Sequence, residues 1–376
     1  MTDETGTPPL PPSATAPTVK CLVWDLDDTL WDGTVLEGDA PLAFPAATDA
    51  LRTLDERGIL HTVASRSDPQ AAAAHLAAQG LDDLFTLLDI GWGAKSDAVR
   101  RIAARLNIGL DTLAFIDNDR MERAEVAAAL PEVRCYPASQ AALLTELPEF
   151  QPPFVTNESR ARRALYRGEL RRKEAQDTYE GAPAEFLASL DLELSVRRAT
   201  EDDLARAHEL TVRTHQLNTT GRTYDLEELR ELCVSPRHRV LVAALTDRFG
   251  SYGTIGLALT EHTDGAQDGS AGTEGASVLR LLLLSCRVIS RGVGPALIGY
   301  LVRDALTRDL RPVAEFVPTP VNRVMLVNLR FSGFEVIERA ADGRVVMGLD
   351  RAASPPLMPA HVRVVDTDAN SPWRDR

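Results

Sequence analysis

The sequence is poor in cysteine and in positive charge. Its 376 residues include four cysteines (Cys21, Cys135, Cys233 and Cys286). None stands in a Cys-x-x-Cys spacing, which argues against a structural zinc site and against a framework of disulfides. Lysine and arginine together number 41 against 55 aspartates and glutamates, giving a formal net charge of -14. Because nucleic-acid binding needs a basic surface, we expect no nucleic-acid partner.

Long apolar runs are also absent. No run approaches the roughly 20 residues that a membrane-spanning helix needs, so we expect no membrane partner. Residues 1–18 contain neither the basic nor the apolar stretch of a secretory signal, and their many prolines and threonines predict a disordered segment. These features favour a cytoplasmic location.

The chain is long enough for two domains. In residues 19–150, short apolar runs alternate with helical segments, which predicts an α/β domain with a doubly wound parallel sheet. In such sheets ligands bind at the carboxyl ends of the strands, and the polar clusters of this region fall at those ends.

Residues 151–185 predict a charged linker helix, and residues 186–350 predict a second α/β domain on a mostly antiparallel sheet. The insert at 261–277 is rich in glycine and aspartate and is expected to be a mobile surface loop. The tail at 351–376 is expected to be poorly ordered.

Three carboxylates end the first apolar run, in the stretch VWDLDDT: Asp25, Asp27 and Asp28. Like charges this close disfavour joint ionisation unless a cation compensates them. If the strand persists, Asp25 and Asp27 point to the same face, while Asp28 caps a turn or faces solvent. Mg²⁺ prefers oxygen ligands and often binds carboxylates together with substrate phosphates, so phosphate chemistry is the leading hypothesis.

The other strand ends supply complementary groups. The Thr29 hydroxyl can fix the loop, and the Ser65 hydroxyl can hold a phosphoryl oxygen, with Arg66 as a neighbouring substrate-binding candidate. Lys95 adds a positive charge at a helix start, where the helix dipole also favours an anion. Asp117 is a natural further metal ligand. Taken singly, such residues are more often caps, turns or solvated charges; their order along the chain favours a site.

The stretch DLDDT, then Ser65, Lys95 and FIDND, resembles the four motifs of the haloacid dehalogenase superfamily of phosphotransferases. The resemblance implies Asp25 as nucleophile and Asp27 as general acid and base. It also implies Mg²⁺ held by Asp25, by the Asp27 backbone carbonyl and by Asp117.

The fourth motif departs from that pattern. Where close relatives tend to show two adjacent acids followed by Asn and Pro, this chain has Asp117, Asn118, Asp119 and Arg120. We therefore expect the second acidic position to be neutral or displaced. The intervals between motifs are too short for the cap domain of many such enzymes, so the expected domain is capless and its crevice open.

In the second domain, the stretch SCRVISRGVG at 285–294 joins a buried strand to a helix and resembles the acyl-CoA-binding turn of the GCN5-related acetyltransferase fold. A glycine turn such as that at Gly292 can present N–H groups to a pyrophosphate, although short glycine turns commonly serve packing alone. Cys286 is the candidate catalytic thiol, with Arg287 and Arg291 as neighbours that could favour a thiolate and bind substrate. The alternative is a buried, inert cysteine. Cys21 competes less well, because it lies toward the wrong end of the sheet.

From about 19 to 345 the chain resembles the FkbH-like family, in which a dehalogenase-type domain is fused to an acetyltransferase-like one. Segments that carry the resemblance include WDLDDTLWDGTVLEGD, RRALYRGELRR and LLSCRVISRGV. It implies transfer of a glyceryl group from 1,3-bisphosphoglycerate, a phosphorylated three-carbon substrate, to the phosphopantetheine thiol of an acyl carrier protein, with loss of the phosphates. The product would feed polyketide or tetronate assembly.

Further candidates are weaker. The stretch RTHQLN contains Arg213, His215 and Asn218 as substrate-binding candidates, or else as a pocket lining or helix end. The basic linker helix could dock an acidic carrier protein, although charge runs are more often solvated faces. Competing functions are a plain Mg²⁺-dependent phosphatase, a catalytically silent carrier-binding scaffold and, ranked lowest, a conventional acetyltransferase.

Overall fold

The computed structural model describes residues 18–35, 40–152, 155–263, 275–352 and 354–368. The chain divides into two compact units, Met1–Leu170 and Arg171–Arg376. Nearly all of the segment predicted to be disordered at 1–18, and most of the insert at 261–277, lie outside the described residues.

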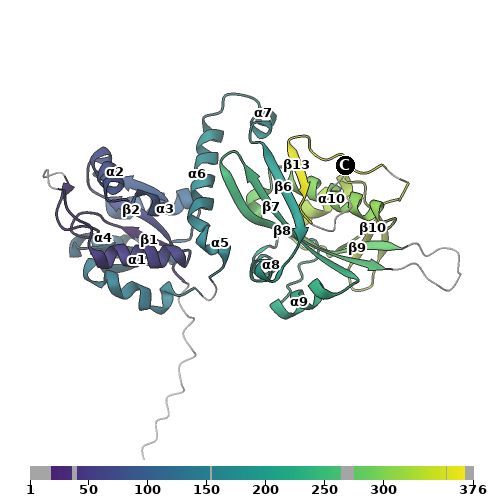
Figure 1. The fold of residues 1–376 in the computed structure, drawn as a ribbon, viewed down its shortest axis with the longest axis horizontal. Helices are drawn as coiled ribbons and strands as arrows, with labels where there is room; N and C mark the ends of the chain where they lie inside the picture. The colour runs from purple at the N-terminus through teal and green to yellow at the C-terminus, as the bar shows by residue number, and fades with distance from the viewer. Residues whose placement is uncertain (1–17, 36–39, 153–154, 264–274, 353, 369–376) are drawn as a thin grey trace, which may run out of the picture. The chain divides into compact units, whose positions relative to one another are not determined.

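The first unit is built on a five-stranded sheet in the order β3-β2-β1-β4-β5 (Figure 1). All of its strand pairs are parallel, which confirms the predicted doubly wound sheet. The strands are β1 (Cys21–Trp24), β2 (Leu60–Ser65), β3 (Leu87–Ile90), β4 (Leu113–Asp117) and β5 (Arg134–Pro137). The sequence did not predict β3 and β5, because both are four-residue edge strands and β5 ends in a proline.

Helices cover both faces of this sheet because β1 is apolar on both sides. Leu22 and Trp24 belong to the core cluster that holds Leu51 of α1, whereas Cys21 and Val23 belong to the cluster that holds Val99 of α3. This is the alternation expected of a strand buried on two faces. The helices are α1 (Pro45–Glu56), α2 (Pro69–Ala78), α3 (Lys95–Leu106) and α4 (Arg120–Ala129), with short 3-10 helices η2 (Asp82–Leu84), η3 (Leu110–Thr112), η4 (Ala138–Glu146) and η5 (Pro148–Phe150).

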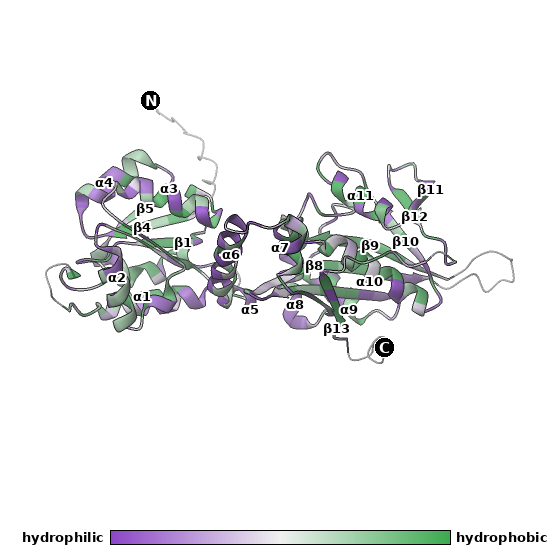
Figure 2. Cartoon of the chain, turned by 90° about the horizontal axis from the view of Figure 1, so that it is seen from above, coloured by the Kyte–Doolittle hydropathy of each residue, from purple (hydrophilic) through white to green (hydrophobic). Residues whose placement is uncertain are grey.

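The predicted linker helix is present as α6 (Arg162–Asp177), after the short α5 (Asn157–Arg160). Figure 2 shows α6 in hydrophilic colours along most of its length. Its arginines are engaged within their own units: Arg162 donates to the Gly58 carbonyl at 3.0 Å, and Arg172 pairs with Asp247 at 2.7 Å.

The second unit is built on an eight-stranded mixed sheet in the order β11-β12-β10-β9-β8-β7-β6-β13. Five of its seven strand pairs are antiparallel, which confirms the prediction of a mostly antiparallel sheet. The strands are β6 (Leu192–Arg198), β7 (His238–Asp247), β8 (Gly250–Thr263), β9 (Ala276–Leu284), β10 (Arg311–Phe316), β11 (Glu335–Arg339), β12 (Val345–Gly348) and β13 (Val362–Asp366).

One core cluster of this unit holds residues of α10 and α11, and a second cluster holds residues of α8 and α9. The helices are α7 (Pro183–Ala188), α8 (Glu201–Arg213), α9 (Leu226–Val234), α10 (Val293–Thr307) and α11 (Arg323–Phe331), with the 3-10 helix η6 (Cys286–Val288). The prediction of a poorly ordered tail is wrong for β13, which pairs in parallel with β6. No helix among the described residues is long and apolar enough to cross a membrane.

The Arg172 guanidinium is the principal buried charge of α6. It pairs with Asp247, donates to the Gly250 carbonyl at 2.8 Å, and stacks 3.6 Å from the centroid of the Tyr252 ring. We expect Arg172→Ala to lower the free energy of unfolding by about 3 kcal/mol, since it leaves the Asp247 charge buried without its partner. Urea unfolding followed by circular dichroism measures this. The matched control is exposed Arg171→Ala, which should cost below about 0.5 kcal/mol; equal losses would contradict the assignment.

Candidate functional site

The candidate site lies where the strand order of the first sheet reverses. After β1 the chain builds β2 and β3 on one side, and then β4 and β5 on the other. Asp25 follows β1 directly and Asp117 is the last residue of β4, its neighbour. Ser65 ends β2 and Lys95 begins α3. Since ligands of open α/β sheets bind at this reversal point, the topology brings these four residues to the expected place.

The centre of the site is a buried ammonium among three carboxylates. Lys95 Nζ makes a short hydrogen bond to Asp25 Oδ1, and lies 3.2 Å from Asp117 Oδ2 and 3.1 Å from Glu122 Oε2. It also donates to the Ala64 carbonyl at 2.8 Å. The side chains of Lys95, Asp25 and Asp117 are at most 9% exposed, and that of Glu122 is 15% exposed.

The charges of this cluster do not balance. Three carboxylates face the Lys95 ammonium, and the partly exposed Arg66 guanidinium pairs with Glu122 at 2.9 Å, which leaves a formal excess of one negative charge among these five side chains. Carboxylate oxygens of Asp25, Asp117 and Glu122 lie within 4.8 Å of one another, and Asp117 Oδ2 is buried without a hydrogen bond. An all-oxygen donor set with this excess charge fits a hard divalent cation such as Mg²⁺.

Burial opposes the charged form of the two aspartates. It raises the pKa of Asp25, and the Lys95 charge together with hydrogen bonds from Lys95, the Leu26 backbone and Ser65 offsets this only in part. Burial and the Asp25 charge together raise the pKa of Asp117 to about 7. Burial alone would lower the pKa of Lys95, but the Asp25 and Asp117 carboxylates raise it on balance. The site therefore holds an ammonium and carboxylates that carry their charge at a cost.

The loop after β1 departs from the expected strand geometry. The strand ends at Trp24, so the condition on which alternation would place Asp25 and Asp27 on one face, a strand that persists through Asp27, is not met. Oδ1 of Asp27 instead accepts the indole N–H of Trp31 at 2.8 Å and the Val35 N–H at 3.4 Å. Among the described residues, the clustered carboxylates that could hold a metal do not include Asp27.

Asp28 and Thr29 shape this loop as expected. Exposed Asp28 has a φ of 52° and accepts the Gly33 N–H at 2.9 Å, which caps the turn. The Thr29 hydroxyl donates to Asp25 Oδ2 at 3.4 Å and accepts the Asn118 N–H at 2.9 Å. It therefore ties the first loop to the loop after β4.

The residue that sequence reasoning missed is Glu122. The sequence predicts that the second acidic position of the fourth motif, at Asn118, is neutral or displaced. In the structure α4 begins at Arg120, and Glu122 in its first turn lies in the cluster. The stretch FIDNDRMER contains a signal for Glu122, because a helix that begins directly after a strand places its first turn near the end of that strand. Arg66 reaches the same carboxylate at 2.9 Å.

The candidates in the second unit form no comparable cluster among the described residues. Cys286 is exposed, so the alternative of a buried cysteine does not describe it. Arg287 Nε donates to Ser285 Oγ at 3.3 Å, and Arg291 is buried and donates to Gln176 at 3.4 Å. Cys21, by contrast, is buried, and burial raises the pKa of its thiol to about 12.

The turn at Gly292 is packed against the chain itself. Its φ of 76° suits glycine, and a Cβ there would lie 2.8 Å from Nε2 of His361. His361 also contacts the Arg291 carbonyl at 3.1 Å. Packing thus accounts for this glycine without a ligand.

The RTHQLN stretch lies beside the end of β9. Asn218 is buried, donates to the Thr214 carbonyl at 3.2 Å and accepts the Gly221 N–H at 2.8 Å, so its amide organises its own loop. The Thr219 N–H next to it donates to the Leu282 carbonyl at 3.0 Å. His215 is exposed. Arg213 ends α8, and its side chain lies outside the described part of the structure.

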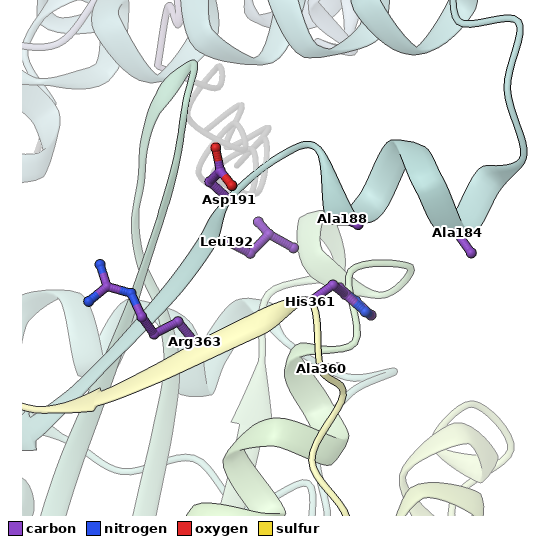
Figure 3. Close-up of a pocket in the computed structure, with 7 residues that line it drawn as sticks. All are labelled: Ala184, Ala188, Asp191, Leu192, Ala360, His361 and Arg363. Carbon is purple, nitrogen blue, oxygen red and sulfur yellow. The ribbon is translucent and has the colours of Figure 1, made fainter.

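A cavity of about 660 Å³ opens in the second unit at the start of β6 and β13 (Figure 3). Its lining combines small apolar side chains with three polar ones: Ala184, Ala188, Asp191, Leu192, Ala360, His361 and Arg363. None of the predicted site residues lines this cavity. The lining residue His361 contacts the Arg291 carbonyl, next to the Gly292 turn.

No family model matches the chain, and no curated protein matches it. Solved structures that it resembles include the N-terminal part of a Bacteroides fragilis protein containing a phosphatase domain, complexed with Mg. That protein is 28% identical, with 36% of this chain and 37% of that chain covered and a TM-score of 0.30.

Two further solved structures are similar to parts of the chain. A Had-superfamily hydrolase from Ehrlichia chaffeensis is 14% identical, with 32% of this chain and 87% of its own covered and a TM-score of 0.28. The aminoglycoside acetyltransferase AAC(6')-Ib with coenzyme A is 22% identical, with 42% and 95% covered and a TM-score of 0.32.

The cation-free protein should be more stable without the Asp117 charge. The pKa of Asp117 is higher in the folded than in the unfolded protein, so folding favours its protonated, uncharged form. The contribution of Asp117 to the free energy of unfolding is therefore greatest below about pH 4 and is lost as the pH rises through about 7. In EDTA at pH 8 we expect Asp117→Asn to raise the free energy of unfolding by roughly 2 kcal/mol, and this gain to vanish near pH 4.

Urea unfolding at both pH values measures the effect. Exposed Asp97→Asn is the matched control and should change the free energy of unfolding by less than about 0.5 kcal/mol. An Asp117→Asn protein less stable than the wild type at pH 8 would contradict the claim that the buried Asp117 charge destabilises the cation-free protein.

Proposed function

We propose that the first unit carries out Mg²⁺-dependent phosphoryl chemistry of the haloacid dehalogenase type. The observation that carries the proposal is the buried cluster of Asp25, Lys95, Asp117 and Glu122 at the reversal point of a parallel sheet. Asp25, Asp117 and Glu122 would hold the ion. When bound, Mg²⁺ would neutralise the excess charge and polarise a phosphoryl group.

The residues of the chain have separate tasks in this proposal. The Asp25 carboxylate attacks phosphorus, forming an aspartyl phosphate while the P–O bond to the substrate breaks. Asp27 gives a proton to the leaving oxygen and then takes one from the water that hydrolyses the intermediate. Both of its N–H contacts use Oδ1, which leaves Oδ2 for the proton. Lys95 and Ser65 lie beside Asp25 and hold the charged oxygens.

At the finer level we propose glyceryl loading of an acyl carrier protein. The donor 1,3-bisphosphoglycerate carries an acyl phosphate and a phosphoester. A thiolate attacks the acyl carbon, so that a C–S bond forms, the C–O bond to phosphate breaks and inorganic phosphate leaves. The phosphoester is hydrolysed at Asp25. Exposed Cys286 is the candidate enzyme thiol, which passes the glyceryl group to the phosphopantetheine thiol by thioester exchange.

A plain Mg²⁺-dependent phosphatase is the second candidate. It is favoured by one observation, which is that the clustered site residues all belong to the first unit. It would release phosphate from small esters without any carrier protein.

Loss of the second phosphate should depend on Asp25. We expect the intact mass of a phosphopantetheinylated carrier protein to gain a glyceryl group on incubation with enzyme, Mg²⁺ and fresh 1,3-bisphosphoglycerate. With Asp25→Asn we expect the glyceryl adduct to form about 10³-fold more slowly or not at all, and the carrier to hold the heavier phosphoglyceryl group instead. Asp28→Asn is the matched control, since asparagine tolerates the left-handed backbone at this position and can still accept the Gly33 N–H.

Undiminished formation of the dephosphorylated glyceryl adduct by Asp25→Asn would refute the assignment of the nucleophile. An unmodified carrier with continued phosphate release would support the plain phosphatase, and absence of both would support the silent scaffold.

Cys286 should separate the two steps. We expect Cys286→Ser to abolish carrier loading while phosphate release from a simple phosphoester stays within about twofold of the wild type, because the thiol does not take part in attack on phosphorus. The control is Cys233→Ser, a partly exposed cysteine of α9. A Cys286→Ser enzyme that loads the carrier at the wild-type rate would show that no acyl group passes through this thiol.

A further inference from the structure

The Glu122 carboxylate is shared between two cationic side chains of unequal burial. Its Oε1 lies 2.9 Å from Nη1 of Arg66, and its Oε2 lies 3.1 Å from Nζ of Lys95. The Lys95 side chain is 3% exposed, whereas that of Arg66 is 45% exposed at the margin of the site. Both oxygens of this candidate metal ligand are engaged, so a metal ion that binds Glu122 competes with its two partners.

Arg66 is the partner that can leave. The buried Lys95 ammonium keeps three further contacts, to the two aspartates of the cluster and to a backbone carbonyl. Arg66 has one other hydrogen bond, from its Nε to the Gly93 carbonyl at 3.1 Å. Because ion pairs at exposed positions contribute little to stability, the pair between Arg66 and Glu122 is the weaker of the two. A metal ion at Glu122 is therefore expected to displace Arg66 and not Lys95.

The charge of the site changes sign when a divalent cation binds. Without the ion, three carboxylates against the Lys95 and Arg66 cations leave a formal excess of one negative charge. Exposed Asp119, at the start of α4, adds a further negative charge beside them. Such a site repels an oxyanion. A divalent cation turns the excess among the five clustered side chains into one positive charge, so an oxyanion should bind after the cation and not before it.

We propose that Arg66 exchanges partners when the site takes up a divalent cation, releasing Glu122 to the ion and binding a phosphoryl oxygen of the substrate. The inference rests on the proposed phosphoryl chemistry and names the residue that makes oxyanion binding depend on the cation. Arg66 directly follows Ser65, which ends β2 and whose side chain hydrogen-bonds to Asp25. A guanidinium suits this task because its N–H donors lie in one plane and match the oxygens of a phosphate.

Removal of the Arg66 charge should strengthen cation binding. In a calorimetric titration of Mg²⁺ into the EDTA-treated and dialysed full chain at pH 8, we expect Arg66→Gln to lower the Kd for Mg²⁺ by about three- to fivefold, which is the range of a partly exposed ion pair. The matched control is Arg120→Gln, which removes an exposed charge two residues before Glu122 on the same helix, where side chains do not face each other. It should change the Kd by less than about twofold.

A double-mutant cycle ties this effect to Glu122. In a Glu122→Gln background, Arg66→Gln should change the Kd for Mg²⁺ by less than about twofold, because the ion pair is already absent. An equal gain in affinity with and without the Glu122 carboxylate would show a long-range effect of charge and would overturn the exchange.

Inorganic phosphate is the probe for the second half of the exchange. With saturating Mg²⁺ we expect Arg66→Gln to raise the Kd for phosphate by about tenfold or more, since a hydrogen bond to a charged group is lost. Without Mg²⁺ the same substitution should have no measurable effect on phosphate binding, because Arg66 is then paired with Glu122. Equal effects with and without Mg²⁺ would show a permanent oxyanion ligand and overturn the exchange. Thermal unfolding followed by circular dichroism checks that each variant is folded.

The exchange and the proposed function fail in different ways. If Arg66→Gln binds Mg²⁺ and phosphate like the wild type, and the wild type releases phosphate from small esters, the exchange is overturned while the phosphoryl chemistry stands. If both binding shifts occur in a chain that releases no phosphate from esters, the phosphoryl chemistry is refuted and the exchange stands. A wild-type chain that binds no Mg²⁺ would overturn the exchange.

Discussion

The contact between the Lys95 ammonium and three carboxylates is the constraint on which the first unit depends. Burying Asp25, Asp117 and Glu122 together would be strongly unfavourable without it, because each loses hydration and each repels the others. The Lys95 ammonium, together with the Arg66 guanidinium that pairs with Glu122, does not fully neutralise the three carboxylates. The remaining negative charge, together with an Asp117 oxygen that accepts no hydrogen bond, is a stability cost that a cation-binding site explains and a structural core does not.

The surrounding fold serves to keep this arrangement in place. The β1 and β4 strands, adjacent and parallel, bring Asp25 and Asp117 to one edge, and the start of α3 adds Lys95. Thr29 ties the loops after these strands together, and the buried indole of Trp31 fixes Asp27. The second unit has its own cores and no comparable cluster among its described residues. In the second unit His361 packs against the Gly292 turn, and the Asn218 side chain makes hydrogen bonds within its own loop. In our proposal this unit therefore contributes to the reaction through the exposed Cys286.

Much of this could be predicted from the sequence, for identifiable reasons. Apolar runs alternating with helices indicated the parallel sheet, and polar residues after each run indicated its ligand-binding edge. Local pattern could not reveal that β1 stops at Trp24, after which Asp27 contacts Trp31, because this depends on where the turn begins. Glu122 was missed although the start of a helix in FIDNDRMER offered a signal for it. The edge strand β13 was missed because its pairing with β6 joins residues far apart in the chain.

The most direct test of the central claim is a calorimetric titration of Mg²⁺ into the EDTA-treated and dialysed chain at pH 8. The account predicts one site per chain, and at least a tenfold weaker affinity for Glu122→Gln than for Glu125→Gln, whose carboxylate is engaged with Ser96 on the neighbouring helix. Absence of binding at millimolar Mg²⁺, or equal affinity of the two variants, would contradict the claim that the buried carboxylates are held for a cation.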